Sequence, residues 1–158
     1  MKKLRGFTLI ELMVTLAVAA IVLSVAVPGM RSFVQNNKAA SQSNKLLGSL
    51  NFARSKAVHF GRTVTLCSST DTATCSGSNN WATGWVLLDP SNAVVQSWES
   101  LSGTSTLTAT ASSITYNGLG GAGAATTFTL VIPDCNGDLG RTVSLTTTGR
   151  AEVTKNNC

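Results

Sequence analysis

The stretch KKLRGFTLIELMVTLAVAAIVLSVAVPGM, residues 2–30, decides the fold of this chain. Between Phe7 and Pro28 it holds 22 residues, of which only Glu11 is charged. An α-helix of that length extends about 33 Å at 1.5 Å per residue, which matches the hydrocarbon core of a bilayer. The segment is therefore predicted to cross a membrane as a helix.

The charges that flank this segment predict its orientation. Lys2, Lys3 and Arg5 precede it, and positive residues keep the adjacent end of a membrane helix in the cytoplasm. The remainder of the chain, which contains all four cysteines, is then expected outside the cytoplasm, where disulfides form.

A cleaved secretory signal is the alternative interpretation of the same stretch. A basic start, an apolar run and the small-residue site Ser24-Val25-Ala26 stand in the required order. Glu11 argues against this alternative, because a carboxylate inside the apolar run costs on the order of 3 kcal/mol unless a partner compensates its charge. A partner for Glu11 is therefore expected.

The segment Gly6-Phe7-Thr8-Leu9-Ile10-Glu11 resembles the processing signature of type IV pilins and type II secretion pseudopilins. The resemblance implies cleavage after Gly6 by a prepilin peptidase and N-methylation of Phe7. It also implies that Glu11 pairs with the N-terminal amine of a neighbouring subunit, so that assembly supplies the counter-charge. Pro28 and Gly29 fall where helices of this family kink or melt.

Beyond Pro28 the apolar residues recur at three- and four-residue steps as far as Gly61. This pattern predicts that the helix continues in amphipathic form and stops at the glycine, with Leu47 and Leu50 in a core. The predicted organisation is a leader peptide at 1–6, a transmembrane helix at 7–29, an amphipathic extension at 30–61 and a head domain at 62–158.

After Gly61 the composition changes to short Thr-, Val- and Ser-rich runs divided by Gly, Asn and Asp clusters. Such runs are typical of antiparallel strands joined by turns. Strands are predicted at 62–67, 84–88, 94–99, 113–116, 126–132, 142–148 and 150–154. The Gly-rich segment 118–123 is predicted to be a flexible loop.

The four cysteines, Cys67, Cys75, Cys135 and Cys158, form no C-x-x-C pair. Their even number and their position after the apolar run predict two disulfides rather than a zinc or redox site. Four cysteines allow three connectivities, of which the local pairs Cys67–Cys75 and Cys135–Cys158 are favoured.

A second resemblance lies in the head, where CSSTDTATC (67–75) is followed by Trp81, Gly84, Trp85 and Asp89. This arrangement is similar to that of the GspH/FimT family of minor pilins. Gly149-Arg150 also resembles the final hairpin of that family. The implied fold is α+β and type IV pilin-like, with a long N-terminal helix packed on an antiparallel β-sheet head. Trp81 and Trp85 are expected to be packed inside it, since each buries a large apolar area.

Catalysis and metal binding find little support in the sequence. The single histidine, His59, has no carboxylate or nucleophile whose position the sequence fixes beside it. In PDCNGD, Asp134, Asn136 and Asp138 resemble the start of a calcium loop, but Leu145 stands where the loop needs its bidentate Glu. The chain is therefore predicted to be neither an enzyme nor a cofactor-binding protein.

Double-stranded DNA is the alternative partner that the sequence raises. Some minor pilins of the resembled family bind DNA through a C-terminal basic motif in which Gly-Arg is followed, one residue on, by a second Arg. Here Gly149-Arg150 is followed by Glu152, which repels phosphate. The candidate phosphate contacts are Arg150, Arg141, Lys155 and Arg62, and the structural alternative is an ion pair of Arg150 with Glu152. Residues 31–158 carry nine Lys and Arg against six Asp and Glu, a mild excess that does not itself indicate nucleic acid.

The resemblances together predict a minor pilin that initiates or stabilises assembly near the tip of a type IV pilus. Its expected partners are other pilins, the prepilin peptidase and the inner membrane, which it crosses once with its head outside the cytoplasm. A minor pseudopilin of a type II secretion system and a DNA-binding pilin for natural transformation are the alternatives. The sequence does not separate the first two, nor does it give the copy number or the position in the fibre.

Overall fold

The computed structural model describes residues 7–135 and 137–158, which form one helix followed by eight strands. The chain divides into two units between Gln35 and Asn36. The helix and strands are α1 (Leu9–Phe60), β1 (Val64–Ser68), β2 (Gly84–Leu88), β3 (Val94–Glu99), β4 (Thr106–Ala109), β5 (Ser113–Tyr116), β6 (Thr126–Val131), β7 (Gly140–Leu145) and β8 (Ala151–Asn156).

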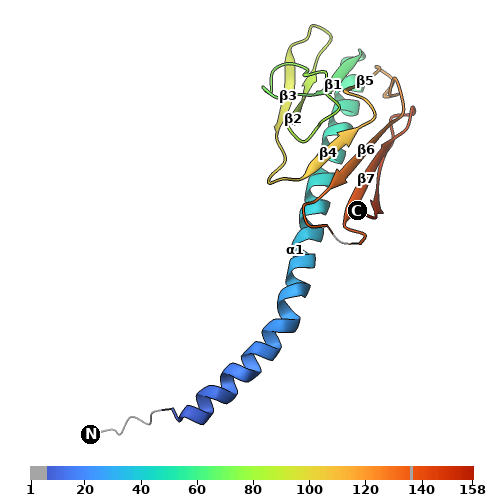
Figure 1. Ribbon diagram of the computed structural model, residues 1–158. Helices are drawn as coiled ribbons and strands as arrows, with labels where there is room; N and C mark the ends of the chain where they lie inside the picture. Colours follow the sequence, from blue (N-terminus) through green and yellow to red (C-terminus); the bar gives the residue numbers. More distant parts are fainter. Residues whose placement is uncertain (1–6, 136) are drawn as a thin grey trace. The chain divides into compact units, whose positions relative to one another are not determined.

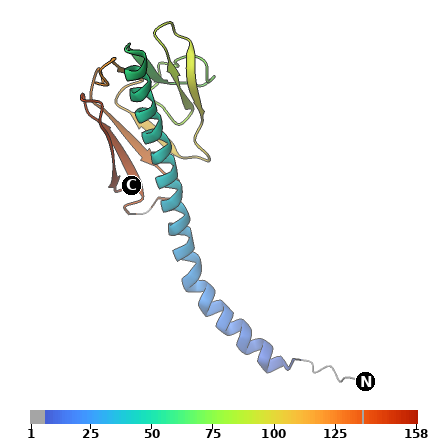
Figure 2. The ribbon, with the colours of Figure 1, turned by 180° about the vertical axis from the view of Figure 1, so that it is seen from behind.

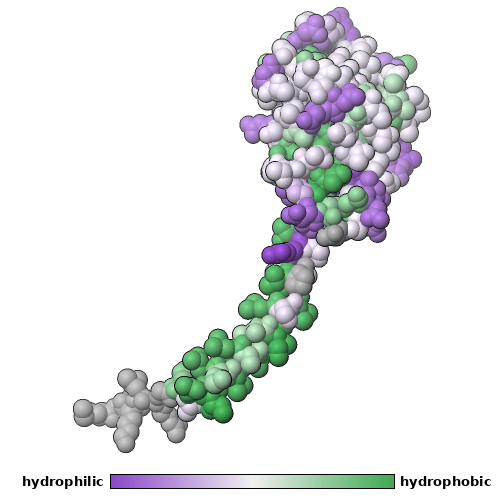
Figure 3. All heavy atoms as spheres, viewed as in Figure 1, coloured by the Kyte–Doolittle hydropathy of each residue, from purple (hydrophilic) through white to green (hydrophobic). Residues whose placement is uncertain are grey.

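The N-terminal unit is an apolar helix that buries little of its own surface. Its large hydrophobic side chains are exposed, with Leu9 at 77% and Val25 at 74%, and Figure 3 shows them gathered along this part of α1. The helix is long and apolar enough to cross a membrane. It runs through Pro28 and Gly29 without a break, so the backbone does not melt there.

The helix α1 ends at Gly61, as the sequence predicts. Gly61 has a φ of 61°, a conformation that favours glycine. Its N–H donates to Val58 O (3.2 Å), and the N–H of Arg62 donates to Ala57 O (3.3 Å). These two bonds form a Schellman motif, which satisfies carbonyls that the helix would otherwise leave open.

The head contains two four-stranded antiparallel sheets, ordered β3-β2-β1-β5 and β4-β6-β7-β8. The chain passes to the second sheet at β4, returns for β5 and then completes the second sheet, and both sheets lie beside the C-terminal part of α1 (Figures 1 and 2). The predicted α+β fold is thereby confirmed. Strand β4 is not among the predicted strands; it has four residues in a Thr-rich run, and its one large apolar side chain is Leu107.

The core of the head lies where α1 meets the two sheets. The helix contributes Ala39, Leu46, Leu50, Ala53 and Ala57, each fully buried. The sheets contribute residues such as Leu66, Trp85, Phe128 and Val143 to the same cluster. The expected core position of Leu50 is therefore confirmed, but that of Leu47 is wrong. Leu47 is only half-buried and its neighbour Leu46 occupies the core, because the buried stripe runs 39, 46, 50, 53, 57.

This register predicts unequal effects of two adjacent substitutions. Leu46→Ala should lower the free energy of unfolding by about 2–5 kcal/mol, because it opens a cavity in a closed core. Leu47→Ala is the matched control and should cost clearly less. Urea titration of the full chain in detergent, followed by tryptophan fluorescence, measures both; equal losses would contradict the assigned helix face.

Candidate functional site

Glu11 lies in the first turn of α1 and caps the helix to which it belongs. Its backbone N–H donates to Thr8 Oγ1 (3.3 Å), while the N–H of Thr8 donates to Glu11 Oε2 (3.5 Å). This reciprocal pair is a capping box, which satisfies two N–H groups at a helix start. The sequence carries its signal, T-x-x-E at 8–11, which the sequence analysis did not use.

The capping bonds leave Glu11 able to bind a second partner. The side chain is exposed within the chain, and an ionised carboxylate offers about four acceptor sites, of which Thr8 N–H takes one. Phe7, the residue predicted to be methylated, is 85% exposed. Gly6, the predicted cleavage position, lies outside the described residues.

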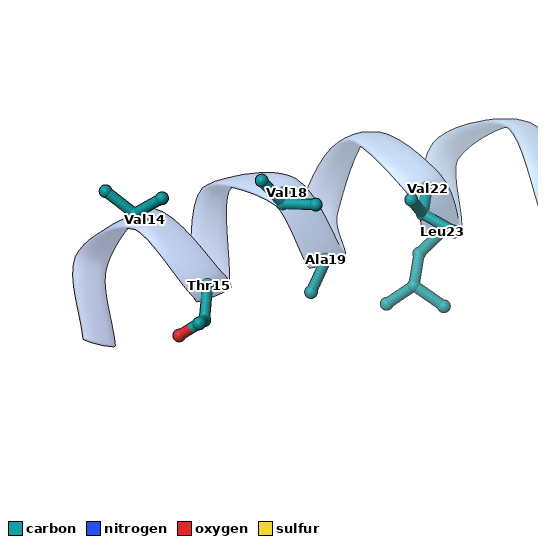
Figure 4. Close-up of a pocket in the computed structure, with 6 residues that line it drawn as sticks. All are labelled: Val14, Thr15, Val18, Ala19, Val22 and Leu23. Carbon is teal, nitrogen blue, oxygen red and sulfur yellow. The ribbon is translucent and has the colours of Figure 1, made fainter. Parts of the chain in front are cut away.

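A shallow apolar groove follows one face of α1 beyond Glu11 (Figure 4). It is lined by Val14, Thr15, Val18, Ala19, Val22 and Leu23. The lining residues recur at intervals of four, so that they form one stripe along the helix. The hydroxyl of Thr15 donates a hydrogen bond to Leu12 O (2.8 Å), so the stripe contains no unsatisfied polar donor from this side chain. Small residues such as Ala19 let a second helix approach closely in a bilayer.

The Cys67–Cys75 disulfide closes a short loop around the carboxylate of Asp71. Asp71 accepts the N–H groups of Thr74 (2.8 Å) and Ala73 (2.9 Å) and the hydroxyl groups of Thr74 and Ser69. The N–H and hydroxyl of Thr74 are the main reason that the pKa of Asp71 lies well below its ordinary value. The loop is thus an ordered element that depends on an ionised carboxylate.

Trp81 and Trp85 both lie in the core, as expected, and are fully buried. Trp81 donates its Nε1–H to Ala111 O (2.9 Å) and packs edge-on against Phe128, with ring centroids 5.0 Å apart. Trp85 stacks on the half-buried Trp98 at 6.4 Å. Neither fully buried ring can serve as an exposed stacking platform.

Cys135 and Cys158 form the second disulfide, so the structure adopts the local pairing. The N–H of Cys158 also donates to Gly137 O (3.1 Å), which holds the end of the chain to this turn. Of the weak calcium pattern, Asn136 lies outside the described residues. Within residues 7–135 and 137–158, no group of three or more His, Cys, Asp or Glu side chains could hold a metal.

The prediction that Arg141 contacts phosphate is wrong, because its side chain is only 4% exposed. Its Nη1 donates to the carbonyl oxygens of Asp138 (3.2 Å) and Gly140 (2.8 Å), and its Nη2 donates to Asn36 Oδ1. The guanidinium thus joins β7 to α1 at the start of the head unit. Because so little of its surface is exposed, the guanidinium is not accessible to a phosphate.

The three other candidate residues do not form one patch. Arg150 pairs with Glu152 at 3.2 Å, with side chains 73% and 58% exposed, as the structural alternative predicted. Lys155 lies opposite Arg141 at the far end of β8, about 16 Å from Arg150 at 3.3 Å per residue. Arg62 is exposed at the end of α1. An exposed ion pair of this kind stabilises a fold little.

Arg54 holds the turns of both sheets to α1, a role that the sequence did not indicate. Its Nε donates to Gly120 O (3.0 Å) after β5, and its Nη2 donates to Thr148 O (3.2 Å) between β7 and β8. Gly149 follows with a φ of 79°, and a Cβ there would lie 2.0 Å from Gly120 O. The glycine of the Gly149-Arg150 pair is therefore required by close backbone packing.

His59 lies exposed in the last turn of α1, with its ring 5.6 Å from that of Phe60. Nothing in the arrangement pairs it with a nucleophile, among the hydrogen bonds and ion pairs of the described residues.

Two family models match this chain, one in its N-terminal segment and one over most of the remainder. The model of the type II transport protein GspH family matches residues 42–149, and the prokaryotic N-terminal methylation motif matches residues 1–27. No protein with a curated description matches.

Two solved structures share the fold. The type IV minor pilin FimU of Pseudomonas aeruginosa superposes with a TM-score of 0.63 at 21% identity, over 77% of this chain and 92% of that chain. The minor pseudopilin EpsH of Vibrio cholerae superposes with a TM-score of 0.51 at 13% identity, over 75% and 97%. At these identities the likeness establishes the fold.

The hydrogen bonds of Asp71 predict a dependence of stability on pH. Its pKa is lowered on folding from an ordinary value of 3.8, so its contribution is fully present above that value and is lost as the pH falls through the lower pKa of the folded state. The free energy of unfolding of the wild type should exceed that of Asp71→Asn at pH 6, and the difference should shrink below about pH 4. Urea titrations at several pH values measure this difference. Parallel pH profiles for the two proteins would contradict it.

Proposed function

Because the chain belongs to the GspH family, we propose that it is a minor pilin that initiates or stabilises the assembly of a type IV pilus near its tip. Members of this family are pilin-like structural subunits and not enzymes. One observation carries the proposal. An apolar helix that the chain leaves uncovered begins with a carboxylate beside the predicted processing site.

The helix supports assembly for a physical reason. Its exposed apolar residues are stable only in lipid or against other apolar helices. The groove at 14–23 offers an apolar stripe for a neighbouring helix. Cleavage after Gly6 would create an amine at Phe7 of a neighbouring subunit, and the free acceptor sites of Glu11 can bind that amine. In this proposal the prepilin peptidase processes the chain, and before assembly the subunit remains in the inner membrane with its head outside the cytoplasm.

A minor pseudopilin of a type II secretion system is the second candidate. The description of the matching family and the fold of EpsH favour it, and the same helix and carboxylate would serve assembly there. A DNA receptor has less support, because Arg141 is buried and Arg150 is paired with Glu152. Arg62 and Lys155 alone offer few phosphate contacts.

Replacement of Glu11 tests the assembly role. Glu11→Ala should insert into the membrane normally but fall by at least about 100-fold in sheared fibres, since breaking a buried ion pair costs about 3–5 kcal/mol. Immunoblots of membrane and sheared fractions measure both quantities. Glu99→Ala removes an exposed carboxylate of the head and is the matched control.

Thr8→Val separates the two roles of Glu11. It removes the hydroxyl that caps the helix but leaves the carboxylate for a neighbouring subunit, so incorporation should fall much less than in Glu11→Ala. If Thr8→Val and Glu11→Ala are equally excluded from fibres, the carboxylate acts through its own helix. Normal incorporation of Glu11→Ala would refute the assembly role.

A further inference from the structure

The segment predicted to be a flexible loop, 118–123, instead begins in a closed turn. Asn117 Oδ1 accepts the N–H groups of Leu119 and Gly121, each at 3.0 Å. The N–H of Gly120 donates to Asn117 O, and the N–H of Asn117 donates to Gly121 O, each at 2.9 Å. Four hydrogen bonds within five residues fix the backbone on both sides of Leu119.

This turn is also fixed to its surroundings at the end of the head where α1 stops, here called the apex. Gly118 packs so closely on Gly61 that a Cβ would lie 2.5 Å from its carbonyl carbon. Arg54 binds Gly120 O, and the N–H of Ala122 donates to Thr147 O (2.9 Å) in the turn between β7 and β8. The apex thus unites the helix end and turns from both sheets.

Leu119 projects from this fixed turn into solvent. At 93% it is the most exposed large hydrophobic side chain among the described residues, and the others of comparable exposure lie in the apolar N-terminal segment 7–30. Val58 (53%) and Phe60 (41%) are exposed on the last turns of α1 close by. An ordered, exposed leucine with apolar neighbours has the character of an anchor for a protein partner.

A small cavity of about 280 Å³ opens beside the anchor, lined by Phe60, Arg62, Asp89 and Pro90. It adjoins the turn of Leu119 because the Cβ position of Gly118 lies 3.0 Å from Arg62 N. The apex therefore offers both a projecting side chain and a recess. Such alternation is what a complementary protein surface requires.

The apex carries a small excess of positive charge. Lys56, Arg62 and Arg150 carry three positive charges against the two carboxylates of Asp89 and Glu152. Because Arg150 is paired with Glu152, the cations in excess over Asp89 are Lys56 and Arg62. In addition, α1 and its cap carry no Asp or Glu from Leu12 to Arg62. The complementary surface is therefore acidic around an apolar pocket.

We propose that the apex docks an acidic face of another pilin-fold subunit of the same fibre, with Leu119 as its anchor and Arg62 and Lys56 as its charged rim. This inference rests on the proposed function as a fibre subunit. It assigns to the head a contact separate from the helix and Glu11, and gives a reason for fixing the turn by Arg54 and Asn117. DNA, lipid and other proteins are the alternative occupants.

Site-specific photo-crosslinking in cells that assemble fibres tests the contact directly. The full chain carries p-benzoylphenylalanine in place of Leu119, or in place of Thr154, an exposed residue on β8, as the control. A covalent adduct with another pilin-fold subunit, identified by mass spectrometry and formed from position 119 only, is expected. Adducts only with lipid, DNA or an unrelated protein, or equal adducts from both positions, would overturn the proposal.

Substitutions supply the second measurement. Leu119→Asp and Arg62→Glu should reduce incorporation into sheared fibres roughly tenfold, as the loss of an interface anchor does. The thermal midpoint of the chain should stay unchanged, because Leu119 is almost fully exposed. Thr154→Asp adds the same charge elsewhere and should have no such effect. Normal incorporation of both apex variants would overturn the proposal.

The two proposals fail in different ways. If Glu11→Ala disappears from fibres while Leu119→Asp is incorporated normally and p-benzoylphenylalanine at position 119 forms no adduct, the chain is a fibre subunit whose apex is not a docking surface. If Glu11→Ala is incorporated normally, the assembly role fails on its own evidence. The adduct at position 119 is then still read separately, since its identity does not depend on Glu11.

Discussion

One helix must satisfy two different environments, and the rest of the structure depends on this constraint. The part of α1 before Asn36 exposes nearly all of its apolar side chains, whereas the part after it buries a single stripe against two sheets. Apolar surface of that extent does not remain in water. The first part therefore requires a covering of lipid or protein, while the second part is packed within the head. Membrane insertion and assembly are the two sources of covering available to such a helix.

Those features that follow from local pattern were predictable from the sequence. The apolar run, the stop at Gly61 and most strands emerge from periodicity and from turn residues. The choice between Leu46 and Leu47 did not, because both adjacent leucines fit a three- and four-residue pattern, and only the packing of the sheets selects one. The short strand β4 was missed for a similar reason, since Thr-rich runs occur in strands and in loops alike.

The roles of the arginines in the head could not be predicted from the sequence, because they depend on contacts between residues far apart in the chain. Arg141 and Arg150 are equivalent letters in a basic C-terminal segment, yet one is buried against Asn36 and the other is exposed beside Glu152. Arg54 gains its role from two carbonyls that follow it by 66 and 94 residues. The Gly149-Arg150 pair shows the same division within two residues. The backbone requires the glycine, whereas the arginine faces solvent, so their shared occurrence does not by itself indicate a joint role in binding DNA.

In the proposed assembly, the carboxylate of Glu11 must be tolerated as a charge before a partner amine reaches it. Until assembly, the N–H groups of the first helical turn and the positive end of the helix dipole stabilise the anion, and the capping box fixes one of its oxygens. These interactions are weaker than a full counter-charge in a medium of low dielectric constant. An amine from a neighbouring subunit would therefore stabilise the anion of Glu11 further. In this proposal the capping box would stabilise the unassembled subunit, and the acceptor sites that it leaves open would supply a driving force for assembly.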